Sequence, residues 1–113
     1  MKIAVTSQNF RTITGHAGKT RRFIIYGAQG TDAPVEIERL DLAKEMSMHS
    51  WAGGEHPIDV SDILITASCG DGFIRKMASR NIQVLRTSET DPLTAIKMVL
   101  KGQELPPPEP HSH

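Results

Sequence analysis

The stretch D-I-L-I-T-A-S-C-G-D-G-F-I-R-K-M-A-S-R-N-I-Q-V-L-R, residues 62–86, decides the fold class. Residues 62–68 form an apolar run suited to an interior strand of a sheet. Residues 71–80 then read as a helix, and 81–86 return to a strand. This alternation predicts an α/β fold with parallel strands. The helix is expected to bury one face, made of Phe73, Ile74, Met77 and Ala78.

Three further strands are predicted upstream. Residues 2–7 have an apolar centre, 21–27 are β-branched and aromatic, and 34–42 alternate apolar and polar side chains. Short loops between them indicate an antiparallel meander. Residues 43–60 are expected to hold a helical turn near 43–48 and otherwise loop. The third strand should be half-buried and at a sheet edge, with inward residues Val35, Ile37, Leu40 and Leu42.

A second helix follows the last strand. Thr90 or Asp91 caps it, Pro92 takes its first position and Gly102 ends it. Its apolar stripe is Leu93, Ile96, Val99 and Leu100. The chain is therefore interpreted as one domain, 1–102, in which helices pack against a mixed sheet of about five strands. The Pro- and His-containing segment 103–113 is predicted to be a flexible tail.

The amino-acid composition narrows the range of functions that this chain could have. The 113 residues include 13 Lys and Arg against 13 Asp and Glu, so the chain has no electrostatic footprint for nucleic acid or an anionic membrane. It also contains no apolar run of membrane-spanning length and no signal peptide. A single cysteine, Cys69, cannot form an internal disulfide, which favours a cytoplasmic location.

The segment T-G-H-A-G-K-T, residues 14–20, ends like a phosphate-binding P-loop, but its context excludes that site. A P-loop requires a glycine where Ile13 stands and a helix afterwards, whereas residues 21–27 predict a strand. What remains is His16, displayed between two glycines. Two interpretations stay open: a ligand-binding loop, or a surface turn whose histidine is incidental.

The segment A-S-C-G-D-G, residues 67–72, joins the interior strand to the first helix. At such a junction the helix N-terminus would stabilise a Cys69 thiolate or bind an anion. Gly70 and Gly72 would let the backbone approach a ligand closely. The alternative is a structural turn with a buried thiol, because cysteine often serves as a small core residue.

A third segment, H-S-W-A-G-G-E-H-P at 49–57, places His49 and His56 on either side of Trp51. Two histidines on one loop suggest metal binding, although the spacing matches no standard zinc pattern. The alternative is a polar loop anchored by the tryptophan.

Together these motifs resemble the dinitrogenase iron–molybdenum cofactor biosynthesis family. That family includes NifX- and NafY-type carriers, the C-terminal domain of NifB and the molybdenum–copper orange protein. The resemblance rests on the first strand, G-H-A-G (15–18), F-I-I-Y (23–26), residues 67–84 and the final helix to Gly102. It implies a ribonuclease-H-like three-layer fold. It also implies that the protein binds or carries an iron–sulfur or molybdenum-containing cluster and is not an enzyme.

The resemblance also suggests a site. In the family, a His-Phe-Gly motif follows the first strand, and its His and Gly correspond to His16 and Gly18 here. Ala17 stands in place of the Phe, whose ring would line one side of the cofactor site. Family members commonly carry a longer helix between the third and fourth strands, which residues 53–65 compress here, so a divergent branch with its own ligand is expected. The metal-ligand candidates are His16, His49, His56 and Cys69, and the cluster is expected to contact Gly15, His16, Gly18, Cys69, Gly70 and Gly72.

Expected partners are cluster donor and acceptor proteins, with the chain as a monomer or weak homodimer. Nuclease activity on the same fold is disfavoured, because the first strand lacks a carboxylate and Asp62 begins its strand instead of ending it. A metal-free regulatory or protein-interaction module, using the Trp51 loop and the tail, remains the alternative function.

Overall fold

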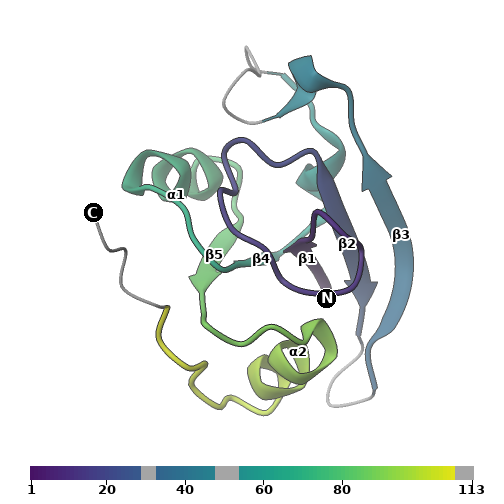
Figure 1. Ribbon diagram of the computed structural model, residues 1–113, viewed down its shortest axis with the longest axis vertical. Coiled ribbons are helices and arrows are strands. Elements are labelled where there is room, and N and C mark those ends of the chain that lie inside the picture. Colours follow the sequence, from purple (N-terminus) through teal and green to yellow (C-terminus); the bar gives the residue numbers. More distant parts are fainter. Residues whose placement is uncertain (29–32, 48–53, 109–113) are drawn as a thin grey trace.

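The computed structural model describes residues 1–28, 33–47 and 54–108. They form a five-stranded mixed sheet in the order β3-β2-β1-β4-β5 (Figure 1). β1–β2 and β2–β3 pair antiparallel, whereas β1–β4 and β4–β5 pair parallel. This is the predicted arrangement of a meander followed by a parallel unit. The strands are β1 Lys2–Thr6, β2 Arg22–Gly27, β3 Val35–Asp41, β4 Ile63–Thr66 and β5 Gln83–Arg86.

Two α-helices complete a three-layer fold. α1 (Asp71–Ala78) lies on one face of the sheet and α2 (Pro92–Leu100) on the other, as Figure 1 shows. Two short 3-10 helices, η1 (Lys44–Met46) and η2 (Pro57–Val60), precede β4. The turn predicted near 43–48 is therefore confirmed as η1, while η2 was missed because Pro57 and the short apolar spacing resemble a loop.

The core consists of one apolar cluster on each face of the sheet. Successive strand residues point to opposite faces, so Leu64 joins the α1 side while Ile63 and Ile65 join the α2 side. Both faces are covered, which explains why the β4 sequence is uninterruptedly apolar. The α1-side cluster includes Phe23, Ile25, Ile58, Phe73 and Met77, and the α2-side cluster includes Ile3, Val5, Ile24, Ala95 and Ile96.

The predicted edge position of β3 is confirmed, but its predicted half-burial is wrong. Val35 and Ile37 are 65% and 53% exposed, and of β3 only Leu40 is buried.

The buried faces of the two helices also differ from the predicted ones. Ala78 is exposed and Leu93 is 40% exposed, whereas Ala95 is fully buried in the α2-side cluster. These short helices bury a narrower stripe than the sequence pattern suggests.

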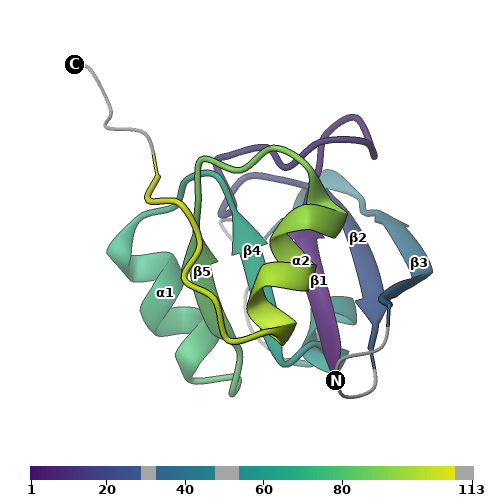
Figure 2. The same ribbon diagram turned by 90° about the horizontal axis from the view of Figure 1, so that it is seen from below.

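The predicted ends of α2 are confirmed. The Asp91 side chain accepts a hydrogen bond from the Thr94 N–H at 2.9 Å, and Gly102 takes a left-handed φ of 73° just beyond the helix. The tail then runs beside β5 (Figure 2), where Leu105 packs against the α2-side cluster. The Thr87 hydroxyl donates to the Pro106 carbonyl at 2.8 Å. Leu105 and Pro106 therefore lie against the domain, and flexibility of the tail stays a prediction.

Candidate functional site

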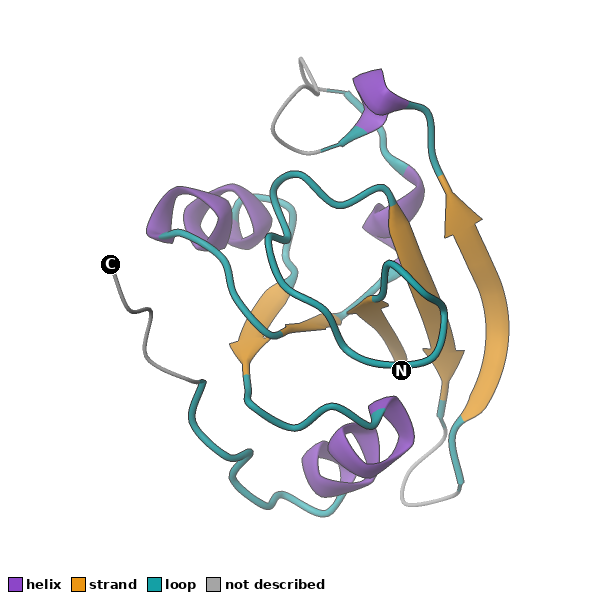
Figure 3. Cartoon of the chain, viewed as in Figure 1, coloured by secondary structure: helices purple, strands orange, loops and turns teal. Residues whose placement is uncertain are grey.

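The two glycine-containing motifs meet at the carboxyl end of the parallel strands β1 and β4. The loop after β1 turns back, so that the Thr14 N–H donates to the Thr6 carbonyl at 2.9 Å. The Thr14 carbonyl accepts from the Ala67 N–H at 3.1 Å, which ties this loop to the turn after β4. Figure 3 shows the long β1–β2 loop passing beside the turn that leads into α1. Ligands in open α/β sheets commonly bind beyond the carboxyl ends of parallel strands.

His16 is exposed and has a left-handed backbone, with φ of 57°. Its N–H donates to the Ser68 hydroxyl oxygen at 2.9 Å, and its carbonyl accepts from the N–H groups of Lys19 and Thr20. Few non-glycine residues adopt this conformation, although histidine does so more often than most. Hydrogen bonds therefore hold the His16 backbone on both its N–H and its carbonyl side.

The residues flanking His16 have different structural roles. A Cβ added at Gly15 would overlap the Ser68 hydroxyl oxygen, so the glycine permits a close approach of the two loops. A Cβ at Gly18 would come no nearer than 4.0 Å to the Phe73 ring. Ala17 is fully buried in the α1-side cluster. The Ala17 side chain thus faces the core and does not line the site beside His16.

Cys69 follows Ser68 directly and is half-buried against the α1-side cluster. Burial raises the pKa of its thiol, an effect that Asp71 reinforces and that the positive charge of Arg86 partly offsets. The thiolate expected from the helix N-terminus is therefore not the resting form, because desolvation outweighs the favourable charges. A metal that binds Cys69 must displace its proton.

The N-terminus of α1 adds anion-binding groups beside Cys69. Gly70 is the N-cap residue and provides no side-chain cap, so the first-turn N–H groups keep their electropositive character. Gly70 and Gly72 are both exposed. A Cβ at Gly72 would lie 3.9 Å from the Arg75 guanidinium, which places this positive charge beside the same turn.

A buried hydroxyl cluster beneath the site was missed by the sequence interpretation. Thr6 and Thr66 end the neighbouring strands β1 and β4, and both are fully buried. The Thr6 hydroxyl donates to the Thr14 carbonyl at 2.6 Å and lies 2.8 Å from the Thr66 hydroxyl. The Thr66 hydroxyl lies 3.2 Å from the carbonyls of both Thr14 and Ser68. The sequence signal was a threonine at the same end of two apolar strands.

The structure brings together Gly15, His16, Gly18, Cys69, Gly70 and Gly72, but not His56. His49 and Trp51 lie outside the described residues. Within residues 1–28, 33–47 and 54–108, no group of three or more His, Cys, Asp or Glu side chains is arranged to hold a metal ion. Asp62 lies at the amino end of β4, where its carboxylate accepts from the Lys2 N–H at 2.9 Å, away from this site.

His56 caps η2 and is only 4% exposed. Its Nδ1 accepts from the Ile58 N–H at 3.2 Å, so Nε2 carries the hydrogen and donates to the Met46 carbonyl at 2.6 Å. Both ring nitrogens of the neutral imidazole are thus used within the domain. Burial lowers the pKa of His56, and hydrogen bonding to Met46 and the charge of Asp59 partly offset this effect.

We expect His56 to make the domain less stable in mild acid. Because its folded-state pKa is lowered, the stabilisation is present above the ordinary value of 6.5 and is lost as the pH falls through the folded-state pKa. Urea denaturation at about pH 7.5 and about pH 5.5 should reveal this loss. His56→Asn should retain a cap but lose that part of the pH dependence, and His56→Ala should cost about 1–2 kcal/mol. An unchanged pH dependence in His56→Asn would contradict the assignment.

The sequence model described as "Dinitrogenase iron-molybdenum cofactor" matches residues 1–102. The chain belongs to the dinitrogenase iron–molybdenum cofactor family. The match includes both the His16 loop and the Cys69 turn. No match was found among curated proteins.

A solved structure supports the fold of this family member. The crystal structure of PH0822 is similar, with a TM-score of 0.70 and 18% sequence identity. The similarity covers 92% of this chain and 93% of PH0822. At this identity the likeness establishes the fold alone. Within the described segments, no helix is long and apolar enough to cross a membrane.

Proposed function

We propose that this protein is a carrier or chaperone for an iron–sulfur or molybdenum–iron–sulfur cluster, which it binds transiently and without turnover. The cluster is cargo, received from one protein and delivered to another. Membership of the dinitrogenase iron–molybdenum cofactor family supports this link. The cytoplasmic location and the monomeric or weakly dimeric state remain predictions from the sequence.

The proposal rests on two different donor residues, His16 and Cys69, which lie on adjoining loops at one end of the sheet. Ser68 accepts from the His16 N–H at 2.9 Å and is the sequence neighbour of Cys69. Thiolate is the preferred protein ligand of iron–sulfur clusters, and imidazole also binds iron and copper. His16 is exposed and Cys69 half-buried, so a cluster would approach the pair from the solvent side.

The surroundings suit an anionic cargo. The uncapped first turn of α1 presents backbone N–H groups next to Cys69, and Arg86 acts on the same thiol. Hydrogen bonds and positive charge around the sulfur atoms stabilise such clusters. Two side-chain donors hold a cluster less tightly than a four-cysteine cage, which favours transfer over permanent retention.

The test is cluster uptake by anaerobically purified protein. His16→Ala and Cys69→Ser should each weaken the uptake of a reconstituted iron–sulfur cluster by about tenfold or more, measured by metal analysis and visible absorption. Circular dichroism should show both variants folded. Ser79→Ala is the control, because this hydroxyl donates to Lys76 at the far end of α1. Unchanged uptake in both site variants would remove the site assignment.

Uptake should also strengthen as the pH rises. The raised pKa of Cys69 keeps the free thiol protonated near neutral pH, and cluster binding must release that proton. Cys69→Ser should flatten the dependence of affinity on pH. A wild-type affinity that does not change with pH would show that Cys69 is not a ligand.

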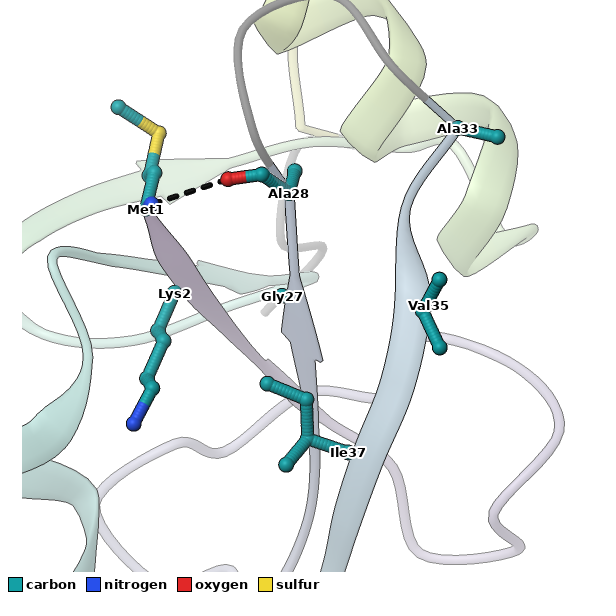
Figure 4. Close-up of a pocket in the computed structure, with 7 residues that line it drawn as sticks. All are labelled: Met1, Lys2, Gly27, Ala28, Ala33, Val35 and Ile37. Atoms are coloured by element: carbon teal, nitrogen blue, oxygen red, sulfur yellow. Dashed lines mark hydrogen bonds between the residues drawn. The ribbon is translucent and has the colours of Figure 1, made fainter.

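A metal-free interaction module is the second candidate function, favoured by an apolar depression at the other end of the sheet. Figure 4 shows it between Met1, Gly27 and Ala28 on one side and Ala33, Val35 and Ile37 on the other. Its volume is about 480 Å³, and Val35 and Ile37 are largely exposed. Exposed apolar side chains on an edge strand are a common feature of interaction surfaces. A colourless, metal-free protein that refuses an added cluster would favour this function.

A further inference from the structure

We propose that Ser68 is a positioning residue, which fixes the His16 loop to the Cys69 turn so that both donors bind one cargo. This inference rests on the proposed carrier function. Ser68 is assigned no contact with the cluster itself. It acts through the backbone of His16.

Ser68 holds the neighbouring loop at two points. Its hydroxyl oxygen accepts from the His16 N–H at 2.9 Å, and its carbonyl accepts from the Ala17 N–H at 3.1 Å. The two residues joined by the side-chain bond are 52 positions apart in sequence. The next residue along the chain is Cys69, so any movement of this turn relative to the loop changes the separation of the two donors.

Gly15 makes room for the Ser68 hydroxyl. Its φ is not left-handed, so backbone conformation does not require a glycine there. A Cβ at this position would instead overlap the Ser68 hydroxyl oxygen. The pairing of a glycine with a serine across the two loops therefore serves the close contact that seats the hydroxyl on the His16 N–H.

The hydrogen bond to Ser68 stabilises an unusual backbone conformation at His16. A left-handed residue other than glycine is strained, and such strain persists where surrounding contacts hold it. The Ser68 hydroxyl holds the His16 N–H, while Lys19 and Thr20 hold its carbonyl. Loss of the hydroxyl would free one side of His16 and let its backbone rotate. The position of the imidazole relative to the Cys69 turn would then no longer be fixed.

The test uses Co²⁺ alone as a spectroscopic probe under anaerobic conditions. In the intact chain, Co²⁺ should give a thiolate-to-metal band from Cys69 and a ligand field that includes the His16 nitrogen. Ser68→Ala should keep the thiolate band, lose the His16 contribution to the ligand field and weaken Co²⁺ binding by about tenfold. Ser79→Ala, which removes a serine hydroxyl bonded to Lys76, should bind as the wild type does.

A double-mutant cycle separates positioning from a general structural role. His16→Ala should weaken Co²⁺ binding in the wild-type background but change it little once Ser68 is alanine, because both substitutions remove the same ligand. Additive effects, or a Ser68→Ala protein that binds like Ser79→Ala, would overturn the inference while leaving the carrier function intact. An intact chain that takes up neither Co²⁺ nor a cluster would refute both.

Discussion

Replacing His16 with glycine should make the protein more stable while largely abolishing cluster uptake. The His16 backbone is left-handed, with φ of 57°, a conformation that glycine adopts without a steric penalty. The substitution should therefore raise the free energy of unfolding by about 0.5–1 kcal/mol. Uptake should fall by about tenfold or more, because the imidazole is lost. Urea denaturation and anaerobic reconstitution measure the two effects.

Two controls distinguish strain from ligand loss. His16→Ala removes the same imidazole but keeps the strain, so it should lose uptake equally and be about 1 kcal/mol less stable than His16→Gly. Asn81→Gly relieves a similar φ of 63° beyond the end of α1 and should raise stability without affecting uptake. Equal stability of the glycine and alanine variants at position 16 would show that the histidine is not strained.

Gly15→Ala should destabilise the domain by about 2 kcal/mol and weaken cluster uptake. The new Cβ would overlap the Ser68 hydroxyl oxygen, which must then rotate away from the His16 N–H or push the loops apart. The expected cost combines a lost hydrogen bond with local overpacking. Urea denaturation gives the stability change, and reconstitution gives the uptake.

Gly18→Ala provides the matched stability control in the same loop. Its Cβ would approach no atom closer than the Phe73 ring at 4.0 Å, so the substitution should be neutral or slightly stabilising. The Ser68→Ala background gives a stricter comparison. With the hydroxyl oxygen gone, the Gly15→Ala Cβ would lie 3.4 Å from the remaining Cβ at position 68, and its cost should nearly vanish. A cost that persists there would place the clash elsewhere.

Local patterns predicted most of the fold. The uninterrupted apolar run of β4 indicated an interior strand, and the Asp91–Pro92 pair marked the start of α2. Predictions failed where burial depended on distant neighbours. Val35 and Ile37 alternate like a half-buried strand, yet both are largely exposed because β3 lies at the sheet edge. Periodicity identifies a face, but only packing decides whether that face is covered.

The candidate site was predicted in part. The glycine-flanked His16 and the Cys69 turn were recognised from composition and from the family resemblance, and the fold places them together. The role of His56 was not predicted, because a histidine beside a proline shows no local sign of a buried cap. The sequence left open whether Cys69 is a thiolate or a buried thiol, and the structure favours the thiol, since desolvation depends on the residues packed around it.

The sequence by itself determined the element order, the α/β class and the family, because these depend on short-range periodicity, caps and spaced motifs. Only the tertiary structure decided that Ser68 meets His16 across 52 positions and that a side chain at position 15 would overlap the Ser68 hydroxyl oxygen. The physical reason is the difference in range between these interactions. Strand and helix preferences act between near neighbours, whereas the separation of two donor residues depends on contacts made only when the sheet brings distant loops together.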